Sequence, residues 1–166
     1  MRRTRIDLLL LALCVLLSGC ASSGVGTSPR ETTTDGCPPT KHFSKKSLPE
    51  KPAELTNETA VEFAVAYENA TTWNEERKNA ETELNVNAQG SLVNRTKTGY
   101  VVHVSGGIST YSCHDGQVAV GDGFVRANYF VNDSTVVKLE HPENRTTDPR
   151  DGGVVVERWN TTTETT

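Results

Sequence analysis

Apolar side chains recur with a helical period in the first half of the chain. The clearest set stands at positions i, i+3, i+4 and i+7: Ala60, Phe63, Ala64 and Tyr67. Five further residues widen this stripe: Val61, Val65, Ala66, Ala70 and Trp73. The spacing places the stripe on one face of an α-helix, and Thr56 or Asn57 can cap its start. We therefore expect one amphipathic helix of about 20 residues. The solvent-exposed face of this helix is expected to carry Glu58, Glu62, Glu68 and Glu75.

After Lys78 the period changes from helical to alternating, which is typical of strands. The β-rich runs begin with Leu84, Val86 and Ala88 on one face and continue at 100–104, 108–113, 117–120, 124–131, 136–140 and 154–159. Gly106-Gly107 predicts a bend or bulge between or within two runs. Asn132-Asp133-Ser134 predicts the turn of a hairpin.

One long helix followed by strands predicts an α+β domain. The preferred architecture is one N-terminal helix packed on a curved antiparallel sheet of five or six strands, similar in shape to the cystatin and NTF2-like folds. Within 124–131, one face carries Val125, Ala127, Tyr129 and Val131. We expect this face to cover Phe63 and Tyr67, because the helix has one dominant apolar stripe.

The first residues have the layout of a signal peptide. Three arginines precede an apolar run at 8–17, which is too short to span a bilayer, and the run ends in Leu17-Ser18-Gly19-Cys20. The cysteine after small residues makes this a lipobox, so we expect lipidation of Cys20 and cleavage before it. Two lipid chains would hold the chain on the outer face of the cytoplasmic membrane. An ordinary secretory signal with an incidental cysteine is the alternative, and the export route stays open between Sec and twin-arginine.

These features predict a signal peptide at 1–19, a lipid-anchored flexible tether at 20–47, a single α+β domain at 48–160 and a disordered tail at 161–166. The tether assignment follows from the Ser, Thr, Gly and Pro content after Cys20. Such a composition buries too little apolar surface to offset the entropy of ordering.

Two cysteines remain for the mature domain, Cys37 and Cys113. In an exported protein two such thiols usually pair, and closing this loop is worth about 4 kcal/mol in the chain-entropy model. The alternative is a metal site formed by Cys113-His114-Asp115 with Cys37 and His42. Their spacing matches no established ligand pattern, so no metal or cofactor is expected.

Charge argues against nucleic acid as a partner. Removal of residues 1–19 takes three of the 17 basic and one of the 21 acidic residues, which leaves a net charge near −6. Nucleic-acid binding needs a basic patch.

Six Asn-x-Ser/Thr triplets begin at Asn57, Asn69, Asn94, Asn132, Asn144 and Asn160. Because Asn57 and Asn69 fall in the predicted helix, we expect glycosylation mainly at Asn94, Asn144 and Asn160.

Several segments together resemble uncharacterised lipoproteins of halophilic archaea. They are Leu17-Ser18-Gly19-Cys20, the Thr-rich tether, the helix from Leu55-Thr56-Asn57-Glu58-Thr59-Ala60 through Tyr67-Glu68, and the hairpin from Tyr129 to Val137. The resemblance covers most of the mature chain and implies an archaeal envelope protein. It implies no catalytic residues.

Enzyme signatures are nearly lacking from the sequence. Neither GxSxG nor HExxH occurs, and Asp115, Asp122 and Asp133 are expected in turns. His103 lies among valines, where a hydrogen-bonded structural role is favoured over that of a general base.

The preferred function is a binding or accessory module of the cell envelope, for an envelope protein or a small ligand, and not an enzyme. A hydrolase-type enzyme using a pocket in the curved sheet, with His103 and a carboxylate, is the alternative, and a structural envelope component is a third. A deep pocket with His103 beside a carboxylate would favour the enzyme, and an exposed apolar patch would favour the interaction role.

Overall fold

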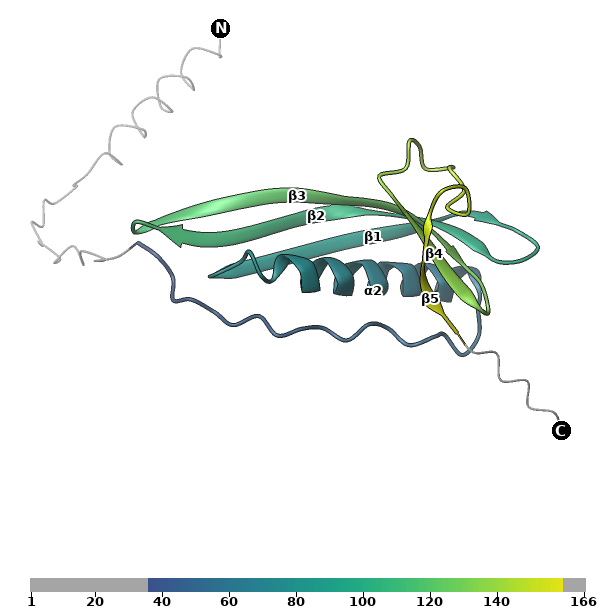
Figure 1. Ribbon diagram of the computed structural model, residues 1–166, viewed down its shortest axis with the longest axis horizontal. Coiled ribbons are helices and arrows are strands. Elements are labelled where there is room, and N and C mark those ends of the chain that lie inside the picture. The colour runs from purple at the N-terminus through teal and green to yellow at the C-terminus, as the bar shows by residue number, and fades with distance from the viewer. Residues whose placement is uncertain (1–35, 160–166) are drawn as a thin grey trace, which may run out of the picture. The chain divides into compact units, whose positions relative to one another are not determined.

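The computed structural model describes residues 36–159, which form one helix packed on an open five-stranded antiparallel sheet (Figure 1). The predicted α+β class is confirmed. In chain order the elements are α2 (Asn57–Glu76), β1 (Glu83–Arg95), β2 (Tyr100–His114), β3 (Gln117–Val131), β4 (Thr135–Glu140) and β5 (Val154–Arg158). The strands lie side by side in this same order, so each pairs with its neighbours in sequence. In the part of the chain described, no helix is long and apolar enough to cross a membrane. The predicted signal peptide, Cys20, Asn160 and the tail at 161–166 lie outside the described residues.

Helix α2 has the length and cap that the sequence predicts. Thr56 is the N-cap residue, and its side-chain oxygen accepts a hydrogen bond from the backbone N–H of Thr59. The Thr59 hydroxyl accepts the N–H of Thr56 in return, which completes a capping box. Five residues of the predicted apolar stripe are buried: Ala60, Phe63, Ala64, Tyr67 and Ala70. Of the others, Val61, Val65 and Trp73 are half-buried, whereas Ala66 is exposed and does not belong to the stripe.

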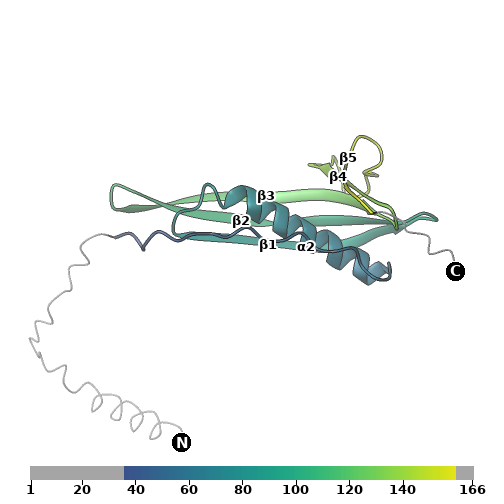
Figure 2. The same cartoon turned by 60° about the horizontal axis from the view of Figure 1, so that its bottom comes forward.

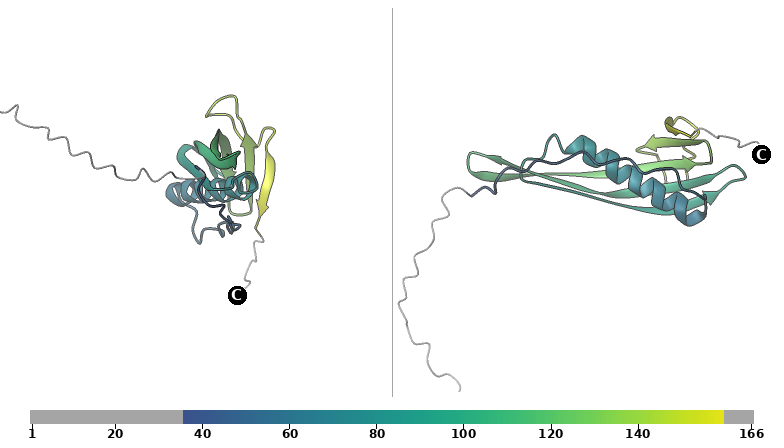
Figure 3. Two further views of the ribbon diagram at one scale, coloured as in Figure 1. Left: turned by 90° about the vertical axis from the view of Figure 1, so that its left-hand side faces the viewer. Right: turned by 90° about the horizontal axis from the view of Figure 1, so that it is seen from below.

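The helix lies across the face of β1, β2 and β3, as the two rotated views show (Figures 2 and 3). Tyr67 contacts Tyr129 edge to face with ring centroids 6.1 Å apart, and Phe63 contacts Trp159 at 5.2 Å. The strand residues predicted to cover the helix all join this core: Val125, Ala127, Tyr129 and Val131. The predicted orientation of the helix is therefore confirmed.

The central hairpin is longer than the sequence indicates. The runs at 100–104 and 108–113 form one strand, β2, and the runs at 117–120 and 124–131 form one strand, β3. Asp122 therefore lies within β3 and not in a turn. The expected bulge at Gly106-Gly107 is also wrong, because β2 pairs with β3 there without a register shift. The two strands are joined at Asp115-Gly116, both with positive φ, which is the two-residue hairpin turn that Asp-Gly favours.

The opposite face of the sheet is covered near β4 by the loop at 141–153. Asn128 on β3 is fully buried, and its side-chain amide donates to the carbonyl oxygens of Asn144, Arg145 and Thr147. This loop covers one end of the hairpin (Figure 1). Farther along β3, residues 117–124 are all exposed.

The segment at 36–56 runs along the side of α2 that faces away from the sheet (Figure 1). The Trp73 indole N–H donates to the Ser44 carbonyl at 2.9 Å, and the Asn74 amide bonds both the N–H and the C=O of Lys46. The predicted tether boundary at residue 47 therefore differs from the structure, since 41–47 lie against the folded domain. The contacts join helix side chains to backbone groups of the segment, so they leave no periodic pattern in its sequence.

Candidate interaction surface

The outer edge of β3 is free along half of the strand. β4 pairs with β3 only from Ala127 to Val131, and the His141 N–H closes the ladder on the Arg126 carbonyl at 2.8 Å. Because backbone groups alternate sides along a strand, even-numbered residues of β3 point toward β4 and odd-numbered ones toward β2. Val118, Val120, Asp122 and Phe124 therefore direct their N–H and C=O groups outward. Within residues 36–159 these groups have no backbone partner.

Apolar side chains accompany this open edge. Val118, Val120 and Phe124 are 42, 52 and 70% exposed, and alternation places all three on the sheet face opposite α2. The loop at 141–153 does not extend over them. A long exposed edge with apolar side chains is a template for pairing with another chain, and most proteins protect such edges. This edge and its three side chains, together called the β3 edge surface, are the candidate functional site.

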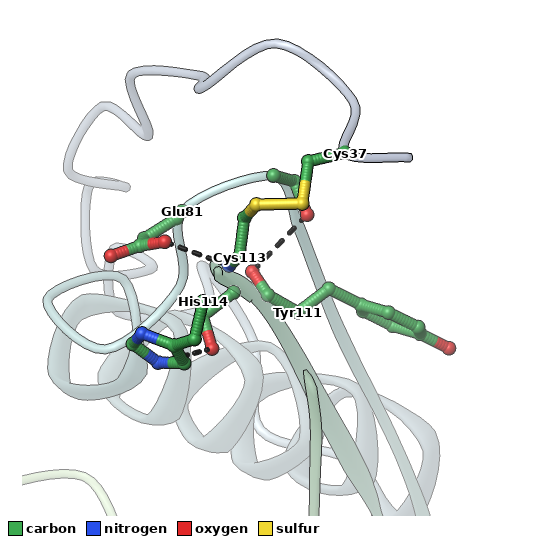
Figure 4. Close-up of a disulfide and its surroundings, with 7 residues drawn as sticks. Cys37, Glu81, Tyr111, Cys113 and His114 are labelled. Atoms are coloured by element: carbon green, nitrogen blue, oxygen red, sulfur yellow. Dashed lines mark hydrogen bonds between the residues drawn. A yellow bond between two sulfur atoms is a disulfide. The ribbon is translucent and has the colours of Figure 1, made fainter. Parts of the chain in front are cut away.

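A disulfide lies beside the start of this surface. Cys37 and Cys113 are bonded, with Cα atoms 5.9 Å apart, and Cys113 faces Val118 in the β2–β3 register. Figure 4 shows the bridge at the end of β2, where the Glu81 carboxylate accepts the N–H of Cys113 at 2.9 Å. The predicted pairing agrees with the structure. The alternative metal site would need both thiols as ligands, and in the structure the disulfide takes up both of them.

A polar groove of about 470 Å³ lies between α2 and the strands, with Tyr67, Val125 and Val156 among its lining residues. At its base Glu68 is 3% exposed, which corrects the expectation that it faces solvent. The Tyr129 hydroxyl donates to one Glu68 oxygen, and the Lys138 amine lies 3.1 Å from the same oxygen. Lys138 also pairs with Glu140 at 2.9 Å. A carboxylate is tolerated at this depth because each of its oxygens is bonded.

The protonation of this cluster favours a structural role. Burial lowers the pKa of Lys138, but its bonds to Glu140 and Glu68 outweigh burial and leave the pKa raised. The amine therefore stays charged and does not act as a nucleophile at neutral pH. Burial, followed by the negative charge of Glu68, raises the pKa of the Tyr129 hydroxyl, which stays protonated. The cluster thus holds α2 against β3 and β4 by charge-assisted hydrogen bonds.

His103 occupies the structural position that the sequence favours. It is 6% exposed, and its Nδ1 lies 2.8 Å from the Asn128 side-chain oxygen. The hollow beside it is lined by side chains that include no carboxylate: Gln89, Ser91, His103, Ser105 and Arg145. Among residues 36–159, the hollow at His103 is thus not lined by a carboxylate.

Two of the three favoured glycosylation sites lie within the described residues. Asn94 and Asn144 are both exposed, Asn94 near the end of β1 and Asn144 in the loop over the sheet. The Asn144 side-chain oxygen accepts hydrogen bonds from the N–H and the hydroxyl of Thr146. The Asn69 side chain is engaged within the domain, since its oxygen accepts a hydrogen bond from the N–H of Ala88. The Asn132 side-chain oxygen likewise binds the backbone N–H groups of Ser134 and Thr135 in the β3–β4 turn. Exposure at Asn94 and Asn144 is compatible with modification, which stays a prediction.

Sequence reasoning missed the β3 edge surface and the buried cluster around Glu68. The alternation of apolar residues from Val118 to Val120, together with the Asp115-Gly116 turn, carried a signal for one long strand. Nothing in the sequence indicated where β4 would stop pairing. Comparison with known proteins found no matching family model, no similar curated protein and no similar solved structure, so the site is interpreted from its own geometry.

Proposed function

We propose that this chain is a lipoprotein anchored through Cys20 on the outer face of the cytoplasmic membrane, and that its domain is a binding module of the cell envelope. The β3 edge surface carries the proposal for binding. It combines open backbone groups with three exposed apolar side chains on one strand. Surfaces of this kind bind an added strand, in which main-chain hydrogen bonds give affinity and side-chain contacts give specificity.

The position of the surface supports its use by an anchored protein. Beyond Gly36 the chain enters the domain at Cys37, which is bonded to Cys113 opposite Val118. The anchored end of the chain thus joins the domain at the same end of the hairpin as the proposed binding surface. The loop at 141–153 and β4 shield only the other end.

Anchoring is tested by Cys20→Ser in the full chain, followed by separation of membrane and soluble fractions. The substitution removes the thiol that would take the lipid, so we expect an uncleaved or released protein. Cys14→Ser is the matched control, because this cysteine would leave with the signal peptide. Retention of the Cys20→Ser protein in membranes at the size of the parent would contradict the anchor.

Binding is tested with a photoreactive amino acid at Val120, in membranes from cells that express the full chain. Glu62 is the control position, since it is exposed on α2 and is not part of the β3 edge surface. We expect a protein adduct from position 120 that is weak or missing from position 62. Equal adducts from both positions would mean that the β3 edge surface has no special role.

A further inference from the structure

We propose that the β3 edge surface pairs antiparallel with the same edge of a second copy of this chain, which joins two five-stranded sheets into one. The inference rests on the proposed function, because it names the partner of that surface. It requires that one strand edge be complementary to itself under a twofold rotation, as a symmetric dimer demands.

The number of open residues limits how two edges can pair. Four residues direct free backbone groups outward: Val118, Val120, Asp122 and Phe124. The edge ends on one side at Arg126, whose carbonyl accepts from His141, and on the other side at the Asp115-Gly116 turn. A partner strand therefore finds room for four consecutive outward-facing residues.

One antiparallel register pairs these four residues with the same four on the second copy. Val118 then faces Phe124 of the second copy, Val120 faces its Asp122, and the twofold axis passes through Gly121. Each outward residue exchanges both hydrogen bonds with its opposite. A shift of two residues in one direction places Asp122 opposite itself, which like charges disfavour, and a shift in the other leaves Phe124 opposite a turn.

The side chains fit this register on both faces. Val118, Val120 and Phe124 from the two copies meet on the face away from α2. Asp122 shares this face opposite Val120 of the second copy, and its carboxylate accepts a hydrogen bond from the Ser109 hydroxyl of its own chain at 2.9 Å. On the other face the facing residues are Ala119, Gly121 and Gly123, whose small size allows close approach. At each end of the paired strands, Arg126 of one copy lies alongside the turn that contains Asp115 of the other copy. Opposite charges therefore face each other at both ends.

Segments of the same chain fit the edge less well. The residues at 160–166 follow Trp159, whose N–H bonds the Ser134 carbonyl at the far end of β3. From Val131 to Phe124 alone is about 23 Å at 3.3 Å per residue, which would use up these seven residues. The residues at 21–35 precede Cys37, which is bonded to Cys113 opposite Val118, but they are mostly Ser, Thr and Gly with a single valine. They cannot cover three apolar side chains.

The size of the contact predicts a weak dimer that depends on anchoring. A four-residue edge with six apolar side chains buries on the order of several hundred Å², below the ~1,200 Å² of stable interfaces. Two chains held on one membrane surface meet at a raised effective concentration, which favours such a contact. The dimer is therefore expected in membranes and not in dilute solution.

Cysteine cross-linking tests the register in membranes from cells expressing the full chain. Gly121→Cys places two thiols across the axis at a non-hydrogen-bonded pair with Cα atoms about 4.5 Å apart, within disulfide range. A Cβ atom added at Gly121 lies 2.7 Å from the Thr110 hydroxyl, which can rotate away, and 4.0 Å from the Thr110 carbonyl oxygen, which is an ordinary contact. Ala119→Cys is the matched control, because the two copies of residue 119 would lie about 13 Å apart along the strands. The unsubstituted chain measures cross-links through native thiols.

We expect disulfide-linked dimer from Gly121→Cys at about tenfold the level from Ala119→Cys, because only the former meets the geometric requirement. Ala119→Cys and Gly123→Cys should link to each other when expressed together, which checks the register independently of Gly121. Adding Val120→Pro to Gly121→Cys should abolish the link without breaking the β2–β3 ladder, since the N–H of Val120 points outward.

Equal dimer from Ala119→Cys and Gly121→Cys would overturn the inference, because it would indicate random collision. The inference would also be overturned if the Gly121→Cys chain remained in the membrane but stayed monomeric, or if it cross-linked to a different protein. A different protein would leave the proposed binding function standing. Both proposals are supported if Cys20→Ser releases the chain from the membrane, and if the link through Gly121→Cys forms in the anchored chain but is lost when Cys20→Ser is added.

Discussion

Adjacent glycines in β2 give a stringent test of how closely β1 and β2 approach. A Cβ atom added at Gly106 would lie 2.0 Å from the carbonyl oxygen of Asn87 and 2.6 Å from the Cα of Ala88. Both are backbone atoms of the neighbouring strand, so no side chain can rotate away. A Cβ atom added at Gly107 meets nothing within 4 Å. Gly106→Ala and Gly107→Ala therefore make the same chemical change in two different settings.

The structure sets the expected size of the difference. Relief of the clash at Gly106 must separate β1 from β2 by about an ångström, which weakens one or two ladder hydrogen bonds at about 1 kcal/mol each. Overpacking adds about 1–3 kcal/mol. Against this, alanine restricts the unfolded chain and gains about 0.4–1 kcal/mol. We expect Gly106→Ala to lower the free energy of unfolding by about 3 kcal/mol, and Gly107→Ala to leave it unchanged or raise it by about 0.5 kcal/mol.

Urea unfolding of the two variants and the parent, followed by tryptophan fluorescence, measures these differences. Trp159 packs on Phe63 in the core and Trp73 packs on Phe43, so both indoles report on folding. Unfolding free energies for the two variants within about 0.5 kcal/mol of each other would refute the reasoning, since substitutions at unconstrained sites stay in that range. The close contact between β1 and β2 would then be wrong.

Three further outcomes follow from the core and the buried cluster. Phe63→Ala should cost about 3–5 kcal/mol in urea unfolding and Glu62→Ala less than about 0.5 kcal/mol, and equal small losses would contradict the orientation of the helix. Glu68→Gln should cost about 3 kcal/mol, because it leaves the buried Lys138 without one of its two carboxylates, whereas Glu62→Gln should be neutral in the same assay. Lys138 lowers the pKa of Glu140 by a hydrogen bond, so Glu140 binds protons less readily in the folded than in the unfolded state. Its contribution is therefore fully present above the unfolded pKa near 4.5 and lost as pH falls through the folded value, and Glu140→Gln should flatten stability against pH in that window. An unchanged pH profile in the variant would count against this ion pair.

The helix and its buried face were predictable because an amphipathic period is a local property. The stripe lies within the short stretch from Ala60 to Tyr67. Burying it is favourable whichever strand covers it, so the helix face can be predicted without knowing the partner strand. The strands were predictable in kind but not in extent. Gly121-Asp122-Gly123 has low β-propensity, and only its pairing with β2 keeps this stretch in the strand.

The features missed are those made by residues far apart in sequence. Glu68 borders the apolar stripe, and its burial depends on Tyr129 and Lys138, which lie 61 and 70 residues away. The free edge of β3 exists because β4 turns away after Glu140 into the loop at 141–153. No local pattern records either event.

The disulfide at Cys37 also determines how the domain bears mechanical load. A pull on the chain before Cys37 passes through the sulfur atoms directly into the end of β2, and the segment that follows Cys37 carries little of the tension. Once the bridge is reduced, the same pull runs along that segment and breaks the bonds of Ser44 and Lys46 to the helix one after another. With the disulfide intact, the force acts on the β2–β3 hairpin near its turn. With the disulfide reduced, the force detaches the segment after Cys37 from α2. Oxidation therefore decides whether tension reaches the sheet or unravels the chain from its beginning.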